Sequence, residues 1–337
     1  MRFAASLLLL ALPSLAAVDG TVINTTTGKP QPNVIVSLVQ PGQGGMQTIG
    51  STKTDAQGKF KIDKSAEGMQ LLQAIHGGVP YNKMLQPGQP TSNVQIDVFD
   101  PTTDAASAKL SQHIVFLQPS SNQLEINEVY FVKNDTNKTY NNTKAGDLQF
   151  YVPGHEAQDA AVRVTINAPG GMPVQRPAEA TNRPGVYKVN YPVKPGETQF
   201  TVAYVLPASE KFTSKSLVKA DTRLVVPTSV TLDGDGITSM GADPSGKANL
   251  YSTSGMEYTV NIKGTGSMAS SGDASGEQQQ EEDTGQPQIT TVKPRIYAQL
   301  PVVLALAAGV LLLGFVLLYR STRPTTTPES TKGKTRR

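Results

Sequence analysis

Apolar and polar residues alternate in short runs along residues 18–88, and Gly, Pro, Asn and Asp separate the runs. A period of two is typical of strands that bury one face, and these separators are typical of turns. The residues that share a face within a run are Val18, Gly20 and Val22, then Val34, Val36 and Leu38, then Phe60 and Ile62. Asp55 and Gly58 suit a tight turn, because an Asp side chain can bond the backbone two residues on and Gly tolerates positive φ. Residues 18–88 are therefore expected to form a small β-sandwich.

A second series of alternating runs occupies residues 89–228. The pattern is clearest from Phe200 to Leu206 and from Val162 to Ile166, where the apolar residues face one way. Pro192 to Gly196 is expected to be a hairpin turn. These runs predict an eight-strand antiparallel sandwich of Ig-like type, whose strand order the pattern does not fix. The candidate strands are Asn93 to Phe99, His113 to Leu117, Leu124 to Val132, Asp147 to Val152, Ala161 to Ile166, Gly185 to Tyr191, Gln199 to Leu206 and Ser216 to Val226.

Residues 229–263 contain two further candidate strands, Val230 to Leu232 and Tyr258 to Ile262, around a Gly-rich stretch. They are expected to form a short β extension, which either completes the edge of the second domain or stands as a small extra unit. Residues 264–296 have almost no apolar content, which is typical of disordered segments. A coil of this length reaches about 30 Å root mean square, so it would serve as a stalk.

The first 17 residues have the order of a secretory signal peptide. Arg2 supplies a positive charge, an apolar run extends from Phe3 to Leu12, and Ser14-Leu15-Ala16 offers the small-x-small pattern that precedes cleavage. The apolar run is too short to span a bilayer. The chain is therefore expected to be exported, with a mature start near Ala17 or Val18.

Residues 297–319 are expected to form one transmembrane helix. Leu300 to Leu318 carries no charge over nineteen residues, which corresponds to about 28 Å of helix, close to the thickness of a hydrocarbon core. The tail at 320–337 holds six basic residues against the single acidic Glu329. Because positive residues stay on the cytoplasmic side, the tail is expected to be cytoplasmic and the bulk of the chain extracytoplasmic. In a bacterium this places the domains on the periplasmic side of the inner membrane.

Composition narrows the classes of function. The chain has no cysteine, which excludes disulfides, thiolate metal sites, a cysteine nucleophile and a lipidated cysteine, and which favours a bacterial source for an exported chain of this size. Arg2 and the tail hold seven of the 30 basic residues, and Glu329 is one of the 27 acidic residues, so the exported part has a net charge of −3. A net negative charge does not favour binding to nucleic acid, which is typical of basic domains.

The order of segments in residues 18–87 resembles that of a known family. The chain carries D-G-T-V, T-G-K-P and N-V-I-V-S-L, and then T-D-A-Q-G-K-F-K-I. In this order the segments resemble the carboxypeptidase regulatory-like domain, and the resemblance implies a transthyretin-like sandwich of about seven strands. The whole sequence therefore predicts a mainly β chain: a transthyretin-like and then an Ig-like sandwich, a disordered stalk and one C-terminal transmembrane helix.

Candidate catalytic groups are few. The three histidines, His76, His113 and His155, show no zinc-ligand spacing, so the peptidase that sometimes accompanies this family is not expected, and each is interpreted as a satisfied or solvated histidine. The sequence also lacks a nucleophile elbow and a nucleotide loop. Glu125 and Glu128 fall on opposite faces of a strand, which indicates one solvated and one edge residue. We therefore predict no enzymatic activity and no cofactor or metal.

Two polar motifs can be interpreted either as functional sites or as simple turns and loops. Asp233-Gly234-Asp235-Gly236 has the acid spacing that begins a calcium loop, but Ile237 stands in place of the next oxygen ligand, which favours a simple turn. The N-x-T sequons matter only in a glycosylating cell, and three of them are expected to form a polar hairpin loop. They stand at Asn24, Asn134, Asn137 and Asn141.

Binding is the expected function. Exposed aromatic rings are the usual platform for sugars, although Tyr at strand positions is more often packed in a core. The candidates for ligand contact are Tyr81, Tyr130, Tyr140 and Tyr151. The leading hypothesis is a non-catalytic, membrane-anchored binding or scaffolding protein of the cell envelope with a protein partner. A carbohydrate-binding module is the first alternative, and a hydrolase whose site assembles from Asp, Glu and Ser across loops is the second.

Overall fold

The computed structural model of the chain describes residues 17–42, 45–64, 68–154 and 162–268. The predicted signal peptide up to residue 16, the transmembrane helix, the cytoplasmic tail and nearly all of the predicted stalk lie outside the described residues. Within the described residues the chain is mainly β, with one short 3-10 helix, η1 (Ala105–Ser107). These ranges hold no helix that is long and apolar enough to cross a membrane.

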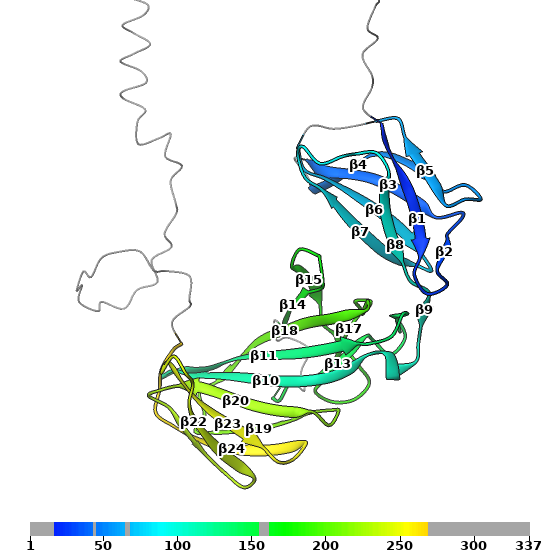
Figure 1. The fold of residues 1–337 in the computed structure, drawn as a ribbon. Helices are drawn as coiled ribbons and strands as arrows, with labels where there is room; N and C mark the ends of the chain where they lie inside the picture. The colour runs from blue at the N-terminus through cyan, green and yellow to red at the C-terminus, as the bar shows by residue number, and fades with distance from the viewer. Residues whose placement is uncertain (1–16, 43–44, 65–67, 155–161, 269–337) are drawn as a thin grey trace, which may run out of the picture. The chain divides into compact units, whose positions relative to one another are not determined.

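The first sandwich consists of two sheets that share one hydrophobic core (Figure 1). Its strands are β1 (Val18–Asn24), β2 (Lys29–Pro30), β3 (Ile35–Gly42), β4 (Gly45–Lys53), β5 (Lys59–Ile62), β6 (Gln70–His76), β7 (Val79–Leu85) and β8 (Val94–Val98). In one sheet, β1 pairs with β2, β5 and β8. In the other the order is β4-β3-β6-β7, and every pair is antiparallel.

Local sequence signals account for much of this sandwich. Every second residue of β1 is buried, as the alternation predicts. The predicted tight turn is also present, because the Asp55 carboxylate accepts hydrogen bonds from the backbone N–H of Gln57 at 2.9 Å and of Lys59 at 2.8 Å. Gly58 closes the turn with a φ of 71°. Both features depend on neighbouring residues alone.

The strand predicted over Asn93 to Phe99 belongs to the first sandwich rather than the second. β8 pairs in parallel with β1, from Gly20 opposite Val94 to Asn24 opposite Val98. Gly20 permits the pairing, because a Cβ there would lie 1.9 Å from the Val94 carbonyl oxygen. The pattern identified this strand but not its partner, since a parallel pair is not joined by a hairpin turn. The boundary between the two sandwiches in the sequence therefore lies after β8 and not at residue 88.

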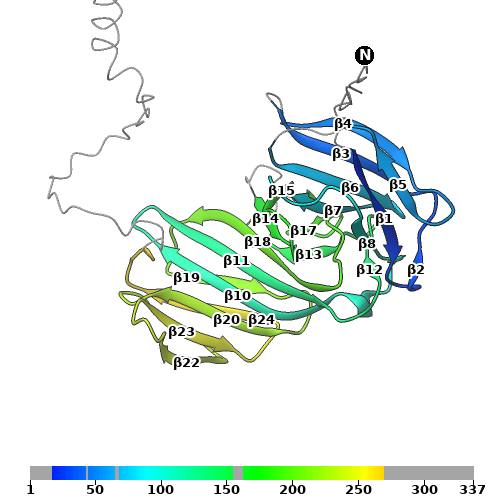
Figure 2. The same ribbon diagram turned by 45° about the horizontal axis from the view of Figure 1, so that its top comes forward.

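The second sandwich contains an eight-stranded sheet and two three-stranded sheets (Figure 2). The large sheet has the order β15 (Val174–Pro177), β14 (Arg163–Asn167), β18 (Gly196–Pro207), β11 (Gln123–Asn134), β10 (Lys109–Pro119), β20 (Asp221–Pro227), β23 (Ala248–Thr253) and β22 (Ile237–Ala242). The small sheets are β13 (Leu148–Tyr151), β17 (Val186–Val189) and β16 (Glu179–Ala180), and β19 (Lys211–Lys215), β24 (Glu257–Lys263) and β21 (Thr231–Asp233). β9 (Pro101–Thr102) and β12 (Thr139–Tyr140) form a short parallel pair. One core contains buried side chains from all three larger sheets.

Two predictions about this sandwich are wrong. It is not an eight-strand antiparallel set, because β10 and β20 pair in parallel and because the described residues include further strands such as β19. Pro192 to Gly196 is not a hairpin turn, since it leads from β17 in a small sheet to β18 in the large one, and Val193 within it bridges to Tyr140. Proline and glycine mark a change of direction but do not specify which sheet the chain enters next.

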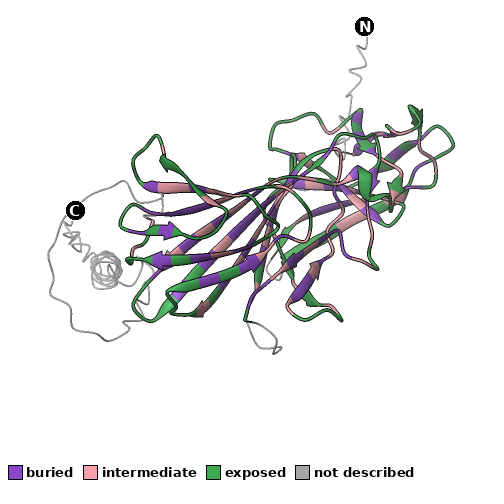
Figure 3. Cartoon of the chain, turned by 90° about the horizontal axis from the view of Figure 1, so that it is seen from below, coloured by how far each residue is buried: buried purple, intermediate pink, exposed green. Residues whose placement is uncertain are grey.

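Residues 229–263 share the core of the second sandwich. β23 and β22 extend the eight-stranded sheet to its edge, while β21 and β24 pair with each other. Val230, Leu232 and Val260 are buried in the common core. Buried and exposed positions alternate along the strands of both sandwiches (Figure 3). These residues are therefore integral to the second domain and not a separate unit.

Candidate functional site

A cluster of four buried polar side chains lies in the core of the second sandwich. Glu128 of β11 is 1% exposed and His113 of β10 is fully buried. His113 Nε2 lies 2.7 Å from Glu128 Oε2. The hydroxyls of Tyr130 and Tyr204 donate hydrogen bonds to the same carboxylate, one to each oxygen. We call these four residues the Glu128 cluster.

Strand register explains how these side chains meet. Alternation along β11 turns Glu128 inward between Ile126 and Tyr130. His113 is the register partner of Tyr130, and their rings stack with centroids 4.2 Å apart. Tyr204 comes from β18, which pairs with the other edge of β11. A buried carboxylate requires partners of this kind, because removing a charge from water is unfavourable unless hydrogen bonds replace the lost solvation.

The tyrosines of the cluster are fixed as donors. Burial, followed by the negative charge of Glu128, raises the pKa of the Tyr130 and Tyr204 hydroxyls well above the usual range. Both hydroxyls therefore keep their protons near neutral pH. Nδ1 of His113 is buried and has no hydrogen-bond partner within the described ranges. With a proton on Nε2, His113 supplies a third donor, and the cluster holds the Tyr130 ring in place.

A cavity of about 250 Å³ opens beside the cluster, and we call it the Tyr130 cavity. Tyr130 joins the two, because its hydroxyl bonds Glu128 while its side chain lines the cavity. Further apolar walls come from Ala108, Leu110, Val132 and Leu148. The lining is drawn from β10, β11 and β13 and from the loop between β19 and β20, so segments distant in sequence converge here. Such convergence on an apolar recess is typical of binding sites.

Asp147 is the buried acid of this cavity. It is 7% exposed, its Oδ1 accepts a hydrogen bond from the backbone N–H of Asn142 at 2.6 Å, and its Oδ2 is buried without a partner in the described part of the chain. Burial raises the pKa of the Asp147 carboxyl, against the lowering effect of the backbone amides of Asn142 and Tyr191. Also on the lining, the Arg183 guanidinium donates to the side-chain oxygen of Gln149. The cavity thus offers an apolar interior with a few polar groups.

The four tyrosines predicted for ligand contact fall in different places. Tyr130 and Tyr140 both line the Tyr130 cavity, but they are only 3% and 7% exposed. Tyr81 is buried in the core of the first sandwich. Tyr151 is half-buried, and Lys215 Nζ lies 4.6 Å from its ring centroid. A platform of exposed rings is therefore wrong for Tyr81, Tyr130 and Tyr140, because strand alternation turns these side chains inward.

The burial of Glu128 was not predicted from the sequence. Glu125 and Glu128 do lie on opposite faces of β11, and Glu125 is exposed, but Glu128 is buried rather than at an edge. The signal was available in the alternation of Leu124, Ile126 and Tyr130, which places Glu128 among inward-facing apolar residues. What the pattern lacked was the position of His113 and the tyrosines, which comes only with the register of three strands.

The three histidines are dispersed. His76 Nε2 lies 2.9 Å from Asp100 Oδ1, His113 belongs to the Glu128 cluster, and His155 lies outside the described residues. Among the residues that the structure describes, no group of three or more His, Cys, Asp or Glu is arranged to hold a metal ion.

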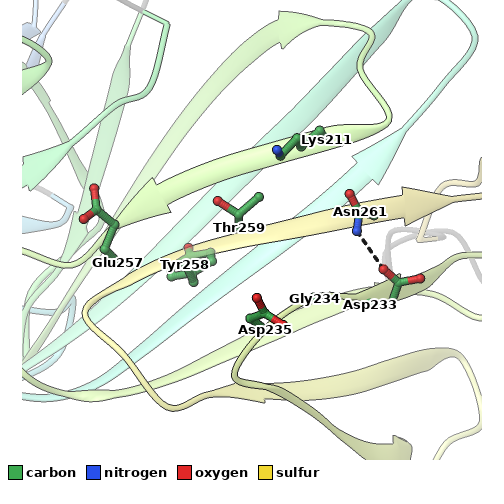
Figure 4. A pocket seen from close by; sticks show the side chains of 8 residues that line it. All are labelled: Lys211, Asp233, Gly234, Asp235, Glu257, Tyr258, Thr259 and Asn261. Atoms are coloured by element: carbon green, nitrogen blue, oxygen red, sulfur yellow. Dashed lines mark hydrogen bonds between the residues drawn. The ribbon is translucent and has the colours of Figure 1, made fainter.

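The Asp233–Gly236 segment forms a turn beside a surface groove (Figure 4). The Asp233 carboxylate accepts a hydrogen bond from Asn261 Nδ2 at 2.8 Å and pairs with Lys263 Nζ at 2.7 Å. Lys263 and then Asn261 lower the pKa of Asp233. Gly236 adopts a φ of 72° in the turn. The carboxylate that would begin a calcium loop is thus already bound by groups of the chain itself.

Two of the four sequons are built into the fold. Asn24 and Asn134 are each 2% exposed. Asn24 Nδ2 donates to Asp100 Oδ1 at 2.7 Å, and Asn134 Nδ2 donates to the Val193 carbonyl oxygen at 2.9 Å. Because Nδ2 is the atom that would carry a glycan, attachment at Asn24 or Asn134 is incompatible with these contacts.

Comparisons with known proteins do not assign the chain to a family. No protein-family model and no curated protein matches the chain. Among solved structures, 46% of the chain is similar to 42% of an M1 zinc metallopeptidase from Deinococcus radiodurans, in a mutant form bound to a Tyr-Ser-Ala substrate, with 12% sequence identity and a TM-score of 0.26. The chain therefore spans less than half of that peptidase, and a similarity this weak does not bear on function.

Proposed function

We propose that the chain is a non-catalytic binding or scaffolding protein of the cell envelope, which receives an apolar group of a protein partner in the Tyr130 cavity. The observation that carries the proposal is the cavity of about 250 Å³ itself, with its apolar walls and its buried Asp147. An apolar recess with a few convergent polar groups is the usual form of a binding site.

Rigid walls favour this function. Tyr130 cannot leave the cavity without losing its hydrogen bond to Glu128, and the Ser216 hydroxyl donates to the Val218 carbonyl oxygen at 2.6 Å within the lining loop. A preformed site loses less conformational entropy on binding than a mobile one. Val218 is 56% exposed, so its side chain is available to a partner.

We propose that the protein is exported and held at the inner membrane by one helix. The support is the order of charge, apolar run and small residues at the N-terminus, and the uncharged run from Leu300 to Leu318 followed by a basic tail. The polar segment at 264–296 would separate the domains from the lipid headgroups. In this arrangement the Tyr130 cavity faces the extracytoplasmic space.

For the domains we propose a carboxypeptidase regulatory-like type for the first sandwich and an Ig-like type for the second. The support for the first is the order of the four segments between Asp19 and Ile62, and the support for the second is its several sheets around one core. The first sandwich would then provide a separate contact surface beside the binding domain.

A pull-down from native membranes tests the proposed function. The baits are the full chain, a chain lacking residues 297–337, and the variant Ala108→Phe, whose larger side chain fills the cavity. Ala106→Phe is the matched control, because Ala106 is exposed and lies nearby in η1.

We expect the full chain and the Ala106→Phe control to recover the same partner, and Ala108→Phe to lose about tenfold or more of that recovery. Equal recovery by Ala108→Phe, or no partner with any bait, would overturn the proposal.

A further inference from the structure

The two outer faces of the first sandwich differ in charge. On the sheet of β1, β5 and β8, the residues that alternate with the core positions include Asp19, Lys59, Lys61 and Asp97. The opposite sheet differs: the outward positions of β3, β6 and β7 carry no charge, and the neighbouring β4 adds Lys53, which pairs with Ile35. The solvated face of an antiparallel sheet is normally polar, so three neighbouring strands whose outward residues are uncharged and partly apolar need an explanation.

Register arranges the outward residues of these three strands in three rows. The first and third rows are apolar and the middle row is polar and uncharged. The rows are Ile35, Ile75 and Pro80, then Ser37, Gln73 and Asn82, then Val39, Leu71 and Met84. The alternate residues Val36, Leu38, Leu72 and Ala74 belong to the inner core, which fixes the nine as outward-facing. Ile35 and Ile75 are each 42% exposed, whereas Val39 is only 8% exposed, so Leu71 and Met84 are the accessible residues of the third row.

We infer that this nine-residue face is the surface through which two copies of the chain associate. A two-fold axis along the middle row places the first row of one copy opposite the third row of the other, so apolar residues meet apolar residues. The middle row then meets itself. Ser, Gln and Asn side chains each donate and accept, so the row is able to bond to its own copy.

The absence of charge at the nine positions supports a second copy over a charged partner. A surface that meets itself brings each charge close to the same charge, which is unfavourable, and the nine positions hold none. Lys53 of β4 extends the first row, so the two-fold axis places it opposite the third row of the other copy rather than opposite itself. Within one copy the middle row is already ordered, because Ser37 bonds Ser51 and Gln73 bonds Asn82, each at 3.1 Å. Ordered side chains lose little entropy when they enter an interface.

The size of the face sets the strength of the association. With strands about 4.8 Å apart and outward residues about 6.8 Å apart along them, the nine positions cover roughly 300 Å² per copy. A standard interface buries about 800 Å² per partner, so the contact is weak between free copies. An anchor confines copies to one membrane plane and raises their effective concentration. Association on the membrane therefore rests on the anchor proposed above, while the face itself does not.

Cysteine crosslinking in membranes tests this inference, because the chain has no cysteine of its own. Gln73→Cys places a thiol in the middle row of the face. Gln95→Cys is the matched control, since Gln95 is an exposed residue of β8 on the charged outer face. We expect a disulfide-linked dimer from the full chain with Gln73→Cys and little from Gln95→Cys. Equal yields from both positions, or no dimer from Gln73→Cys, would overturn the inference.

A charge exchange separates a second copy from another partner. In chains that carry Ser37→Cys as the reporter, Gln73→Glu alone and Gln73→Lys alone are each expected to reduce the dimer yield several-fold, through repulsion across the axis. Mixing the two is expected to restore it. If the mixture stays as low as either variant while thermal melting shows that both fold, the face does not contact its own copy.

Discussion

At the scale of single residues, one carboxylate organises the core of the second sandwich. Glu128 occupies a position on β11 whose inward neighbours are apolar, and it remains buried because His113, Tyr130 and Tyr204 all bond to it. Removing one member of such a set leaves the others buried without a partner, which destabilises more than the loss of one hydrogen bond.

Glu128→Ala is expected to lower the free energy of unfolding by about 3–5 kcal/mol, the range for a buried pair that loses one partner. The control is Glu125→Ala, which alters an exposed acid on the same strand and is expected to change stability by less than about 0.5 kcal/mol. Urea denaturation of the two variants beside the unchanged protein gives both values. Similar losses for the two variants would contradict a structural role for the cluster.

Lys194 links stability to pH. Burial lowers the pKa of its ammonium from 10.5 to about 8. The unfolded chain therefore holds more protons between about pH 8 and pH 10.5, so this group adds stability as pH rises through that window. In Lys194→Met that increase is expected to disappear, whereas Lys133→Met, at an exposed lysine paired with Asp135, retains it. Denaturation at about pH 7.5 and about pH 10 measures the difference, and an unchanged slope in Lys194→Met would contradict the assignment.

The candidate site was predictable from the sequence only in part. Tyr130 and Tyr140 stood among the predicted contact residues and both line the cavity, but as buried walls rather than as exposed rings. Asp147 carried no signal, because its burial depends on the loop that starts at Asn142 and on the packing of β13. Residue type indicates which side chains can take part in binding, whereas tertiary packing determines how they face the ligand.

At the scale of elements, local patterns predicted the strands but not which strands pair when they lie far apart in the sequence. The turn at Asp55 was predictable because its hydrogen bonds reach only two and four residues along the chain. The parallel partner of β8 lies more than seventy residues away in β1, and the segment from Pro192 to Gly196 changes sheets without any local mark. Strand existence is a local property, and strand order is not.

Gly20→Ala tests the assignment of β8 to the first sandwich. A Cβ at Gly20 would lie 1.9 Å from the Val94 carbonyl oxygen, so β1 and β8 must separate to admit it. We expect a loss of about 1–3 kcal/mol in the free energy of unfolding and faster amide exchange over Val94–Val98. Gly171→Ala is the control, because a Cβ there meets its nearest atom at an ordinary 3.5 Å. Unchanged exchange in β8 would show that the pairing is not under this constraint.

At the scale of the whole molecule, the proposed anchor determines where the domains act. With external protease and intact inner membranes, we expect digestion of the domains and protection of a tag placed after Arg337. A chain without residues 297–337 is expected in the soluble fraction. A tag digested from outside would reverse the proposed orientation, because the basic tail would then lie on the extracytoplasmic side.

Photo-crosslinking from position 218 in the full chain tests whether the second sandwich binds a partner through the Tyr130 cavity. Val218 lines the cavity and is 56% exposed, and Met240 on β22, which is 49% exposed, is the matched position away from it. We predict a discrete crosslinked product from position 218 that Ala108→Phe abolishes, and no such product from position 240. Equal products from both positions, or a product from position 218 that Ala108→Phe leaves unchanged, would show that the Tyr130 cavity does not bind a partner.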